Sequence, residues 1–366
     1  MQNKRLLFFA SDFSIGLSSL LTDQLCAIQD AGINVVAVAG ENEQEPGLSK
    51  ILAERGANLI RMTGLDAHAD FKRLVSEIAK IVKENSIQVI HVQNNWQLAI
   101  AAAVKAKLLF SNRVKIVYTL HGFRHNHPVK SRIAQIVIGS ALFVAADNVI
   151  CMTEYLKRKF SLLSYKIKLI PLGIKEDYFI DEFIAPPTYS LHLVFPAQFR
   201  HGKNQDMIMR AFKKYVEQTN DQSATLTLPG NGPLLDDMKT LARDLGISDK
   251  VRFPGFVSKD DVKRLYLESN VAIVASNSET FGQSIVEPFV LGRCVLSTPV
   301  GIAPEIISDG INGYIYKTED ELTYILCQLN KNRNLLVDIG KHNFAARDKF
   351  RWREVIERYA NNFVVY

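Results

Sequence analysis

The sequence predicts an α/β protein with two doubly wound domains, each a parallel β-sheet covered by helices on both faces. Short apolar runs rich in β-branched residues alternate with helix-length amphipathic runs up to residue 172, and the alternation starts again near residue 190. Continuously apolar strands are typical of parallel sheets, because helices bury both of their faces. The length of 366 residues suits two domains of ordinary size.

The first half contains six predicted strands and one helix with clear end signals. The helix is predicted within residues 18–32, because a serine cap precedes it and Gly32 follows its last residue. Helix-length runs also separate the later strands. The strands are predicted over residues 5–11, 33–40, 87–93, 114–120, 148–153 and 166–172.

The second half repeats the pattern, and the segment between the halves has the composition of a linker. That segment is acidic, aromatic and proline-bearing. We expect the last segment to be a helix that returns to the first domain; a plain terminal helix of the second domain is the alternative. The second set of strands is predicted over residues 191–198, 224–230, 250–256, 271–276, 294–299 and 313–317. The predicted parts are residues 1–172, the linker 173–190, the second domain 191–345 and the terminal helix 346–366.

Composition excludes several classes of protein. No segment reaches the roughly 20 apolar residues of a membrane span, and the N-terminal apolar run is short and followed by an acid, as in a first strand. The four cysteines have no paired spacing, which favours buried free thiols over a disulfide framework or a zinc site.

The charge is concentrated in one region. Residues 101–175 hold 13 Lys and Arg against two acids, which predicts an anionic partner. A nucleic acid, a phosphorylated substrate and an anionic membrane surface are the candidates, and a solvated basic face is the alternative. No aromatic-rich basic motif supports nucleic-acid binding.

The most informative motif lies in residues 278–306. Gly282 marks the bend between a strand and a helix-like run, with Glu279 before the helix and Glu287 in its second turn. A helix N-terminus offers free backbone N–H groups to a phosphate. The two carboxylates can accept hydrogen bonds from hydroxyl groups. A sugar nucleotide has both kinds of group, while an ordinary turn with two solvated acids is the alternative.

Other candidate residues follow predicted strands. Arg200 and Lys203 follow the first strand of the second domain and could clamp a diphosphate. Gly230 and Asn231 permit close backbone approach to a ligand, and the turn at residues 255–256 exposes backbone groups that could read a base. The alternatives are a solvated loop and ordinary glycine turns.

Two features of the first domain bear on chemistry. His121 ends a predicted strand, a position suited to acid–base work, although a lone histidine is often structural. His91 ends the preceding strand in the same way. The turn at Gly16 lacks the dinucleotide fingerprint, which argues against a nicotinamide oxidoreductase.

The order of these motifs resembles a known family. Lys203 in its basic loop is followed by GNGP, VRFPGF, ETFGQSIVE, CVLSTPVGIAPEII and DGINGYIY. This series resembles the donor domain of retaining glycosyltransferases of the GT-B fold, specifically glycosyltransferase family 4. VIHVQNN, TLHGF, ADNVICMT and LIPLGI in the first half match more loosely. TLHGF before a basic run is similar to members that build capsule, O-antigen and other lipid-linked bacterial glycans.

The resemblance implies two Rossmann-like domains facing across a cleft. It also implies transfer of a sugar from a nucleotide diphosphate with retention of configuration and without a metal or cofactor. Lys203 and a neighbouring arginine would bind the diphosphate, Glu287 the ribose, and Glu279 the donor sugar, with His121 approaching from the other domain. The turn near Gly16 would lie beside the phosphates and the acceptor. Further nucleotide-sugar contacts are implied for Gly230, Asn231, Gly255, Phe256, Phe281, Gly282, Gln283 and Ser284.

The sequence departs from the family pattern at three places. Gln198 stands near the usual arginine of the basic loop, so Arg200 is the expected substitute. The usual double glycine of the first turn is reduced to Gly16. Pro288 and Phe289 replace the small residues that usually follow the second glutamate.

The leading hypothesis is a cytoplasmic glycosyltransferase that moves a hexosyl or N-acetylhexosaminyl group at the inner face of the plasma membrane to a lipid-linked or lipopolysaccharide-type acceptor. We expect a UDP-sugar donor, although guanosine and adenosine donors share the phosphate contacts. Residues 132–147 form either an interfacial helix or a core helix. A sugar-nucleotide hydrolase or epimerase of the same fold and a non-catalytic sugar-nucleotide-binding subunit are the alternatives.

Overall fold

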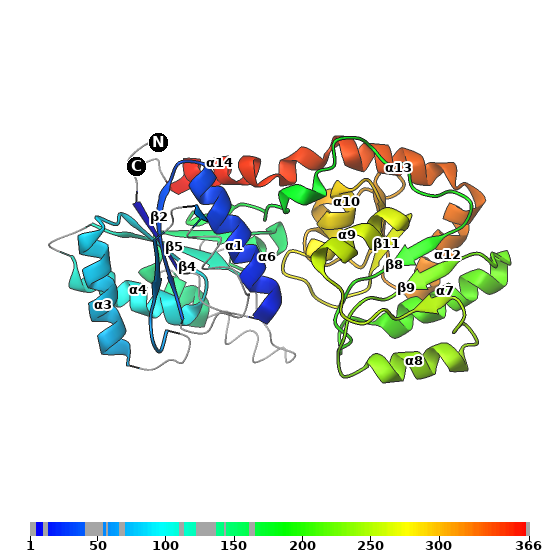
Figure 1. Ribbon diagram of the computed structural model, residues 1–366, viewed down its shortest axis with the longest axis horizontal. Coiled ribbons are helices and arrows are strands. Elements are labelled where there is room, and N and C mark those ends of the chain that lie inside the picture. Colours follow the sequence, from blue (N-terminus) through cyan, green and yellow to red (C-terminus); the bar gives the residue numbers. More distant parts are fainter. Residues whose placement is uncertain are drawn as a thin grey trace. The chain divides into compact units, whose positions relative to one another are not determined.

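The chain divides into two compact units (Figure 1). Unit 1 comprises Met1–Gly173 with Trp352–Tyr366, and unit 2 comprises Ile174–Arg351. The terminal helix therefore returns to the first domain, as expected. The segment predicted as a linker belongs to unit 2 from Ile174 onward. The computed structural model describes residues 5–9, 14–40, 54–55, 58–65, 70–109, 113–121, 137–142, 144–160 and 165–363.

Unit 1 contains a parallel sheet of seven strands in the order β3-β2-β1-β4-β5-β6-β7. Six strands lie within their predicted segments. The exception, β3, was not predicted, because its sequence NLIR is short and only partly buried at the sheet edge. The strands are β1 (Arg5–Phe9), β2 (Asn34–Ala39), β3 (Asn58–Arg61), β4 (Val89–Val92), β5 (Lys115–Leu120), β6 (Asn148–Cys151) and β7 (Ile167–Leu169).

Helices cover both faces of this sheet. Helices α3 (Phe71–Glu84) and α4 (Asn95–Lys107) pack together on one face, and α1 (Ser14–Asp30) packs with α14 (Trp352–Phe363) on the other (Figure 1). The short α6 (Glu154–Lys159) follows β6. The Asp70 and Asn94 side chains cap α3 and α4 by accepting backbone N–H bonds.

The first helix begins earlier than predicted. It starts at Ser14, four residues before the serine at position 18, because Leu17 extends the apolar spacing of Leu21, Leu25 and Ile28 toward the N-terminus. Gly16 therefore lies in the first turn of α1 and not in a turn before the helix.

The terminal helix α14 is held to unit 1 by buried aromatic side chains. Trp352 and Tyr359 are almost fully buried. A Cβ atom at Gly173 would lie 2.3 Å from Cδ2 of Trp352, so only glycine fits beneath the indole ring. Phe350, which lies within the predicted terminal segment, instead packs edge-on against Phe289 in unit 2.

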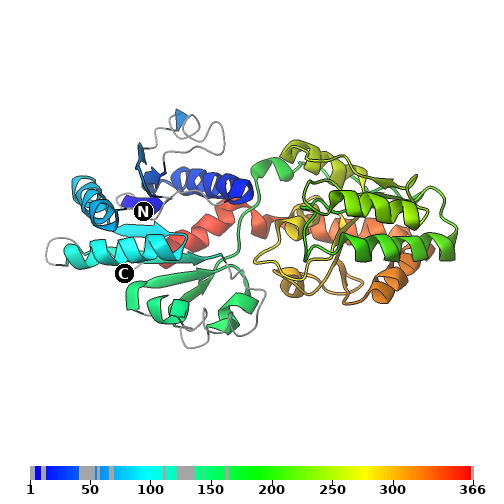
Figure 2. The same cartoon turned by 90° about the horizontal axis from the view of Figure 1, so that it is seen from below.

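Unit 2 contains a parallel sheet of six strands in the order β10-β9-β8-β11-β12-β13, and all six were predicted. In the view of Figure 2, helices of unit 2 lie in front of this sheet. The observed strands are shorter than predicted. In particular, the first strand ends at Val194 and not near Gln198. The strands are β8 (His192–Val194), β9 (Thr225–Thr227), β10 (Val251–Arg252), β11 (Val271–Val274), β12 (Cys294–Ser297) and β13 (Gly313–Ile315).

The helices of unit 2 also form two layers. Helix α12 packs on α7 beside α8, whereas α10 packs with α9 and α13 (Figure 1). A right-handed crossover between parallel strands produces this arrangement on either side of the sheet's central pair. The helices are α7 (Gln205–Thr219), α8 (Leu235–Asp244), α9 (Lys259–Glu268), α10 (Gln283–Val290), α11 (Ala303–Ile306), α12 (Glu319–Lys331) and α13 (Asn334–Ala345), with 3₁₀ turns at Glu176–Tyr178 and Arg347–Phe350.

No helix among the described residues is long and apolar enough to span a bilayer. The cysteines match the sequence prediction of free thiols: all four are unpaired, and Cys151, Cys294 and Cys327 are buried.

Arg293 holds the segments around β12 together. It is fully buried, and its guanidinium donates to backbone carbonyls of Tyr266 at 2.9 Å and Ile184 at 2.8 Å. Further bonds reach the carbonyls of Leu267, Leu291 and Gly292. Burial lowers the pKa of Arg293 to about 10. These bonds tie the segment at Ile184 to the ends of α9 and α10, so it is part of unit 2 and not a separate linker.

Replacing Arg293 with methionine should destabilise unit 2 by more than about 3 kcal/mol, because several buried carbonyl groups would lose their donor. Hydrogen exchange over residues 174–351 measures this loss. The control Arg264→Met removes only exposed ion pairs and should change stability by less than about 0.5 kcal/mol. Equal hydrogen-exchange protection of residues 174–351 in the two variants would contradict the structural role of Arg293.

Candidate functional site

The central strands of unit 2 bring two predicted loops to one edge of the sheet. Strand β8 pairs in parallel with β11, although about 80 residues separate them in the chain. Parallel neighbours end at the same edge, so the loop after β8 and the loop after β11 emerge together. This is the point where the strand order reverses, the usual ligand position in such sheets.

Lys203 and Glu279 meet at this edge. The Lys203 ammonium donates to Oε1 of Glu279 at 2.5 Å, with side chains 14% and 18% exposed. The buried Ser276 hydroxyl donates to the same oxygen at 2.7 Å. The structure thus brings together a predicted cation and a predicted carboxylate. Ser276 is an additional site residue that the sequence prediction missed.

Two asparagines fix the basic loop against the loop after β11. Asn204 adopts a left-handed backbone with φ of 52°, and its amide donates to the carbonyl of Ala275 at 2.8 Å and to Asn277 Oδ1 at 2.6 Å. The backbone N–H of Asn277 donates to the carbonyl of Gly202 at 2.8 Å. Neither asparagine was predicted. The one signal in the sequence was an asparagine immediately before a helix, where left-handed conformations are tolerated.

The N-terminus of α10 lies next to Glu279, as predicted. Gly282 caps the helix with φ of 93° and accepts the N–H groups of Ile285 and Val286. The first helical N–H groups, those of Gln283 and Ser284, have no acceptor within the helix. The buried Phe281 contributes its carbonyl to the N–H of Ile302 at 2.8 Å, which holds the turn in place.

Glu287 lies in the second turn of α10, where the sequence placed it, but its surroundings differ from those of Glu279. Burial raises the pKa of Glu287 to about 7, with a smaller opposing effect from Lys259. The charge of Glu287 adds to the effect of burial in raising the pKa values of Tyr178 and Tyr266. Tyr266 is fully buried, and its hydroxyl has no hydrogen-bond partner among the described residues. Both tyrosines were absent from the sequence prediction.

Arg200 shares the basic loop with Lys203 but points to solvent. It is exposed, and only its backbone is fixed, by a bond from its N–H to the carbonyl of Gln198 at 3.0 Å. The side chain of Gln205 donates to the same carbonyl at 3.0 Å. The structure therefore brings Lys203 to Glu279 without bringing Arg200 to either of them.

The glycine turns of the second domain pack against one another. The N–H of Gly230 donates to the carbonyl of Gly255 at 2.7 Å, and a Cβ atom at Gly230 would lie 2.0 Å from the carbonyl oxygen of Ala197. Backbone packing alone therefore requires glycine at 230. A Cβ at Gly255 would lie 3.5 Å from Asn231 Oδ1, and the neighbouring Phe256 is 74% exposed.

His121 closes β5 in unit 1. Its Nε2 lies 2.7 Å from Oε1 of Gln93, and burial lowers its pKa to about 4. Gln93 follows β4 and was not predicted. The rest of the histidine loop, residues 122–130, lies outside the described residues, as do residues 132–136 of the predicted apolar helix.

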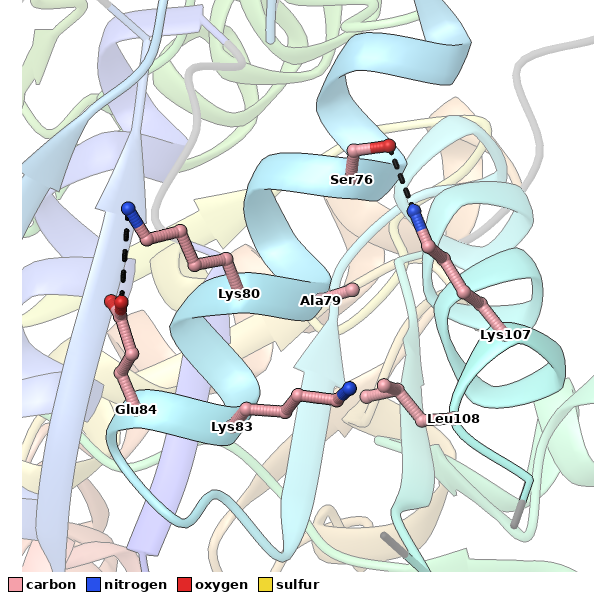
Figure 3. Close-up of a pocket in the computed structure, with 7 residues that line it drawn as sticks. All are labelled: Ser76, Ala79, Lys80, Lys83, Glu84, Lys107 and Leu108. Carbon is pink, nitrogen blue, oxygen red and sulfur yellow. Dashed lines mark hydrogen bonds and ion pairs between the residues drawn. The ribbon is translucent and has the colours of Figure 1, made fainter. Parts of the chain in front are cut away.

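A surface pocket of about 390 Å³ between α3 and α4 contains none of the predicted site residues (Figure 3). In this pocket the Lys107 ammonium donates to the Ser76 hydroxyl at 2.9 Å. Three lysines on a surface do not define a binding site. The lining residues are Ser76, Ala79, Lys80, Lys83, Glu84, Lys107 and Leu108.

The described residues hold no cluster of three or more His, Cys, Asp or Glu side chains that could bind a metal ion. The expectation of metal-independent chemistry stays a prediction.

Comparison with known proteins connects both halves of the chain to one class of enzyme. The family model for glycosyl transferases group 1 matches residues 180–344, and the model for Glycosyltransferase Family 4 matches residues 16–178. The chain is 25% identical to N-acetyl-alpha-D-glucosaminyl L-malate synthase of Bacillus anthracis, over 78% of this chain and 77% of that enzyme. It is 24% identical to alpha-monoglucosyldiacylglycerol synthase of Streptococcus pneumoniae, over 79% and 70%.

The solved structures show the same fold. Anabaena Alr3699/HepE in complex with UDP superposes with a TM-score of 0.80 over 99% of this chain and all of that chain, at 18% identity. A crystal structure of the same Anabaena protein contains UDP-glucose and gives a TM-score of 0.77. Such low identity supports a shared fold, whereas the shared function rests on the family models.

Replacing Glu287 with glutamine should change how stability depends on pH. Because the folded-state pKa of about 7 lies above the ordinary 4.5, burial of Glu287 costs nothing below pH 4.5 and an increasing amount as pH rises to about 7. We expect the free energy of unfolding of the variant to rise relative to that of the wild type across this interval. The slope of this difference should approach about 1.4 kcal/mol per pH unit. Urea unfolding at a series of pH values, followed by circular dichroism, measures the slope.

The matched control is Glu268→Gln, which changes a carboxylate on α9 that is 57% exposed. Its stability relative to the wild type should stay flat over the same interval. If the difference in free energy of unfolding between Glu287→Gln and the wild type also did not change with pH, the raised pKa of Glu287 would be wrong.

Proposed function

The chain belongs to the glycosyltransferases of the GT-B fold, and on that premise we propose that it transfers a sugar from a UDP-sugar to a glycan acceptor, with retention of configuration and without a metal ion. The observation that carries this proposal is the Lys203–Glu279 pair beside the N-terminus of α10. It brings a cation, a carboxylate and the first N–H groups of a helix to one sheet edge.

The diphosphate is assigned to the positive groups. Lys203 and the first N–H groups of α10 face the same edge, and Arg200 on the basic loop is exposed and able to swing toward an anion. As the bond between the anomeric carbon and the phosphate oxygen breaks, negative charge develops on the leaving diphosphate. Fixed positive groups stabilise that charge more strongly than water does.

The carboxylates are assigned to hydroxyl groups. Glu279 receives hydrogen bonds from Lys203 and Ser276 on one oxygen, which leaves its second oxygen for a sugar hydroxyl. Glu287 is assigned to the ribose, and the paired turns at Gly230 and Gly255 to the base. His121 of unit 1 is assigned to the donor sugar. The acceptor hydroxyl attacks the face that the diphosphate leaves, and a phosphate oxygen takes its proton, so no enzyme nucleophile is needed.

The acceptor is proposed to be lipid-linked. One relative bears the name alpha-monoglucosyldiacylglycerol synthase, which indicates a lipid product for that enzyme. In unit 1 the basic region 101–175 also exposes apolar side chains, and Lys159 lies 4.3 Å from the centre of the Tyr155 ring. Basic and aromatic groups together suit an anionic membrane surface. Among the described residues of this region, the large exposed apolar side chains are those of Leu109, Val137, Val144, Tyr155 and Tyr165.

Titration calorimetry with UDP and with inorganic pyrophosphate tests the donor site. Lys203→Ala should weaken both ligands by about 10–100-fold, because it removes a charge-assisted contact to phosphate. Glu287→Ala should weaken UDP by a similar factor and leave pyrophosphate unchanged, because pyrophosphate has no ribose. The matched controls Lys213→Ala and Glu268→Ala change a half-buried lysine of helix α7 and an exposed glutamate of helix α9.

No binding of UDP or of any UDP-sugar at millimolar concentration would overturn the proposed donor. Binding without transfer to any acceptor would favour a sugar-nucleotide-binding subunit, and rapid release of free sugar would favour a hydrolase. Proton NMR of the transferred sugar reads its anomeric configuration directly.

Flotation with vesicles containing phosphatidylglycerol tests the membrane proposal. The wild-type chain should float at low salt and detach at high salt. Reversing Arg158 and Lys159 to glutamate on α6 should reduce flotation several-fold, because each basic residue near the surface contributes about 1 kcal/mol. Reversing Lys214 and Arg264 on unit 2 serves as the control and should have little effect. Binding that is insensitive to salt or to the α6 variant would contradict an electrostatic contact.

A further inference from the structure

We propose that a buried hydrogen-bond chain from the terminal helix sets the protonated nitrogen of His121. The chain runs from Tyr359 on α14 through His91 on β4 and Gln93 to His121 after β5. Its members are positioning residues, since they act on His121 rather than on a substrate. The consequence for catalysis rests on the proposed function, whereas the chain of bonds itself does not.

The chain is continuous and almost fully buried. The Tyr359 hydroxyl lies 2.6 Å from His91 Nδ1, and the amide nitrogen of Gln93 lies 3.4 Å from His91 Nε2. The amide oxygen of Gln93 lies 2.7 Å from His121 Nε2. The Thr119 hydroxyl lies 2.7 Å from His91 Nε2. His91, Gln93, Thr119 and Tyr359 are each at most 3% exposed.

Both imidazoles are neutral, so each carries one proton. Burial lowers the pKa of His91 to about 3 and that of His121 to about 4. Because the interior disfavours a second proton on either ring, each histidine has one donor nitrogen and one acceptor nitrogen. The neighbours of each ring then decide which nitrogen holds the proton.

The Gln93 amide gives the chain its direction. Its nitrogen faces His91 Nε2, and the Thr119 hydroxyl lies against the same ring nitrogen. With both groups donating to Nε2, His91 holds its proton on Nδ1 and donates it to the Tyr359 hydroxyl oxygen. Its oxygen faces His121, so His121 holds its proton on Nε2 and donates to Gln93. In this chain of bonds His121 Nδ1 therefore carries no proton. The backbone N–H of Gln93 donates to Gln97 Oε1 at 2.7 Å, which fixes the segment.

The arrangement explains a role for α14 beyond packing. The hydroxyl of Tyr359 on this helix lies 2.6 Å from Nδ1 of His91 in β4. A phenylalanine at 359 would keep the ring contact with His91, whose ring centre lies 5.4 Å away, and remove only the hydroxyl. This substitution separates hydrogen bonding from packing.

Nitrogen-15 NMR of the full chain with labelled histidine tests the proposal. We expect His91 to be protonated on Nδ1 and His121 on Nε2, with the signals assigned from His91→Gln and His121→Gln variants. Tyr359→Phe should shift the nitrogen-15 resonances of the His91 and His121 rings. It should also lower kcat about 2–10-fold, because one buried hydrogen bond is lost, while donor KM changes little. Tyr215→Phe removes a buried hydroxyl bonded to Asp221 in unit 2 and should leave the histidine signals unchanged.

A proton on Nδ1 of His121 would overturn the proposal, as would a Tyr359→Phe chain with unchanged histidine signals. Shifted histidine signals with an unchanged kcat would overturn the positioning role while the transferase assignment stood. If the wild-type chain transfers no sugar from any nucleotide, the proposed function fails, and the NMR spectra still decide the protonation of both rings.

Discussion

The pairing of parallel strands that are distant in sequence is the constraint on which both candidate regions depend. Buried backbone N–H and C=O groups must be bonded, and parallel strands can meet that demand only with neighbours reached by a crossover. The β8–β11 pair thereby sets Lys203 beside Glu279, and the β4–β5 pair sets Gln93 beside His121. Any weakening of these ladders would separate the functional side chains before altering their chemistry.

The candidate residues of the two units differ in electrostatic character. Unit 2 presents an ion pair and a helix N-terminus. The Ser276 hydroxyl donates to the carboxylate of the pair, and Asn204 joins the basic loop to the loop after β11. Unit 1 presents a neutral histidine whose surroundings disfavour a positive charge. Fixed charge suits a diphosphate that gains negative charge, and a neutral acceptor suits an uncharged sugar.

Close backbone packing explains why several sequence motifs contain glycine. At Gly230 and Gly301 a Cβ atom would meet a carbonyl oxygen at 2.0 and 2.2 Å, and both glycines have positive φ. The loops that carry Asn231 and Phe281 can lie where they do only because these positions lack side chains. Loop packing therefore requires glycine at these motif positions even before any ligand is considered.

The sequence by itself determined the α/β class, every strand of the described residues except the short edge strand β3, and the placement of Glu279 and Glu287 around the start of α10. These features follow from local periodicity and from a glycine at a bend, which act over a few residues. Only the tertiary structure decided that Lys203 pairs with Glu279, that Arg293 joins residue 184 to unit 2, and that Tyr359 reaches His91. Those contacts join residues from 76 to 268 positions apart, and no local pattern encodes which distant side chain will complete a hydrogen bond.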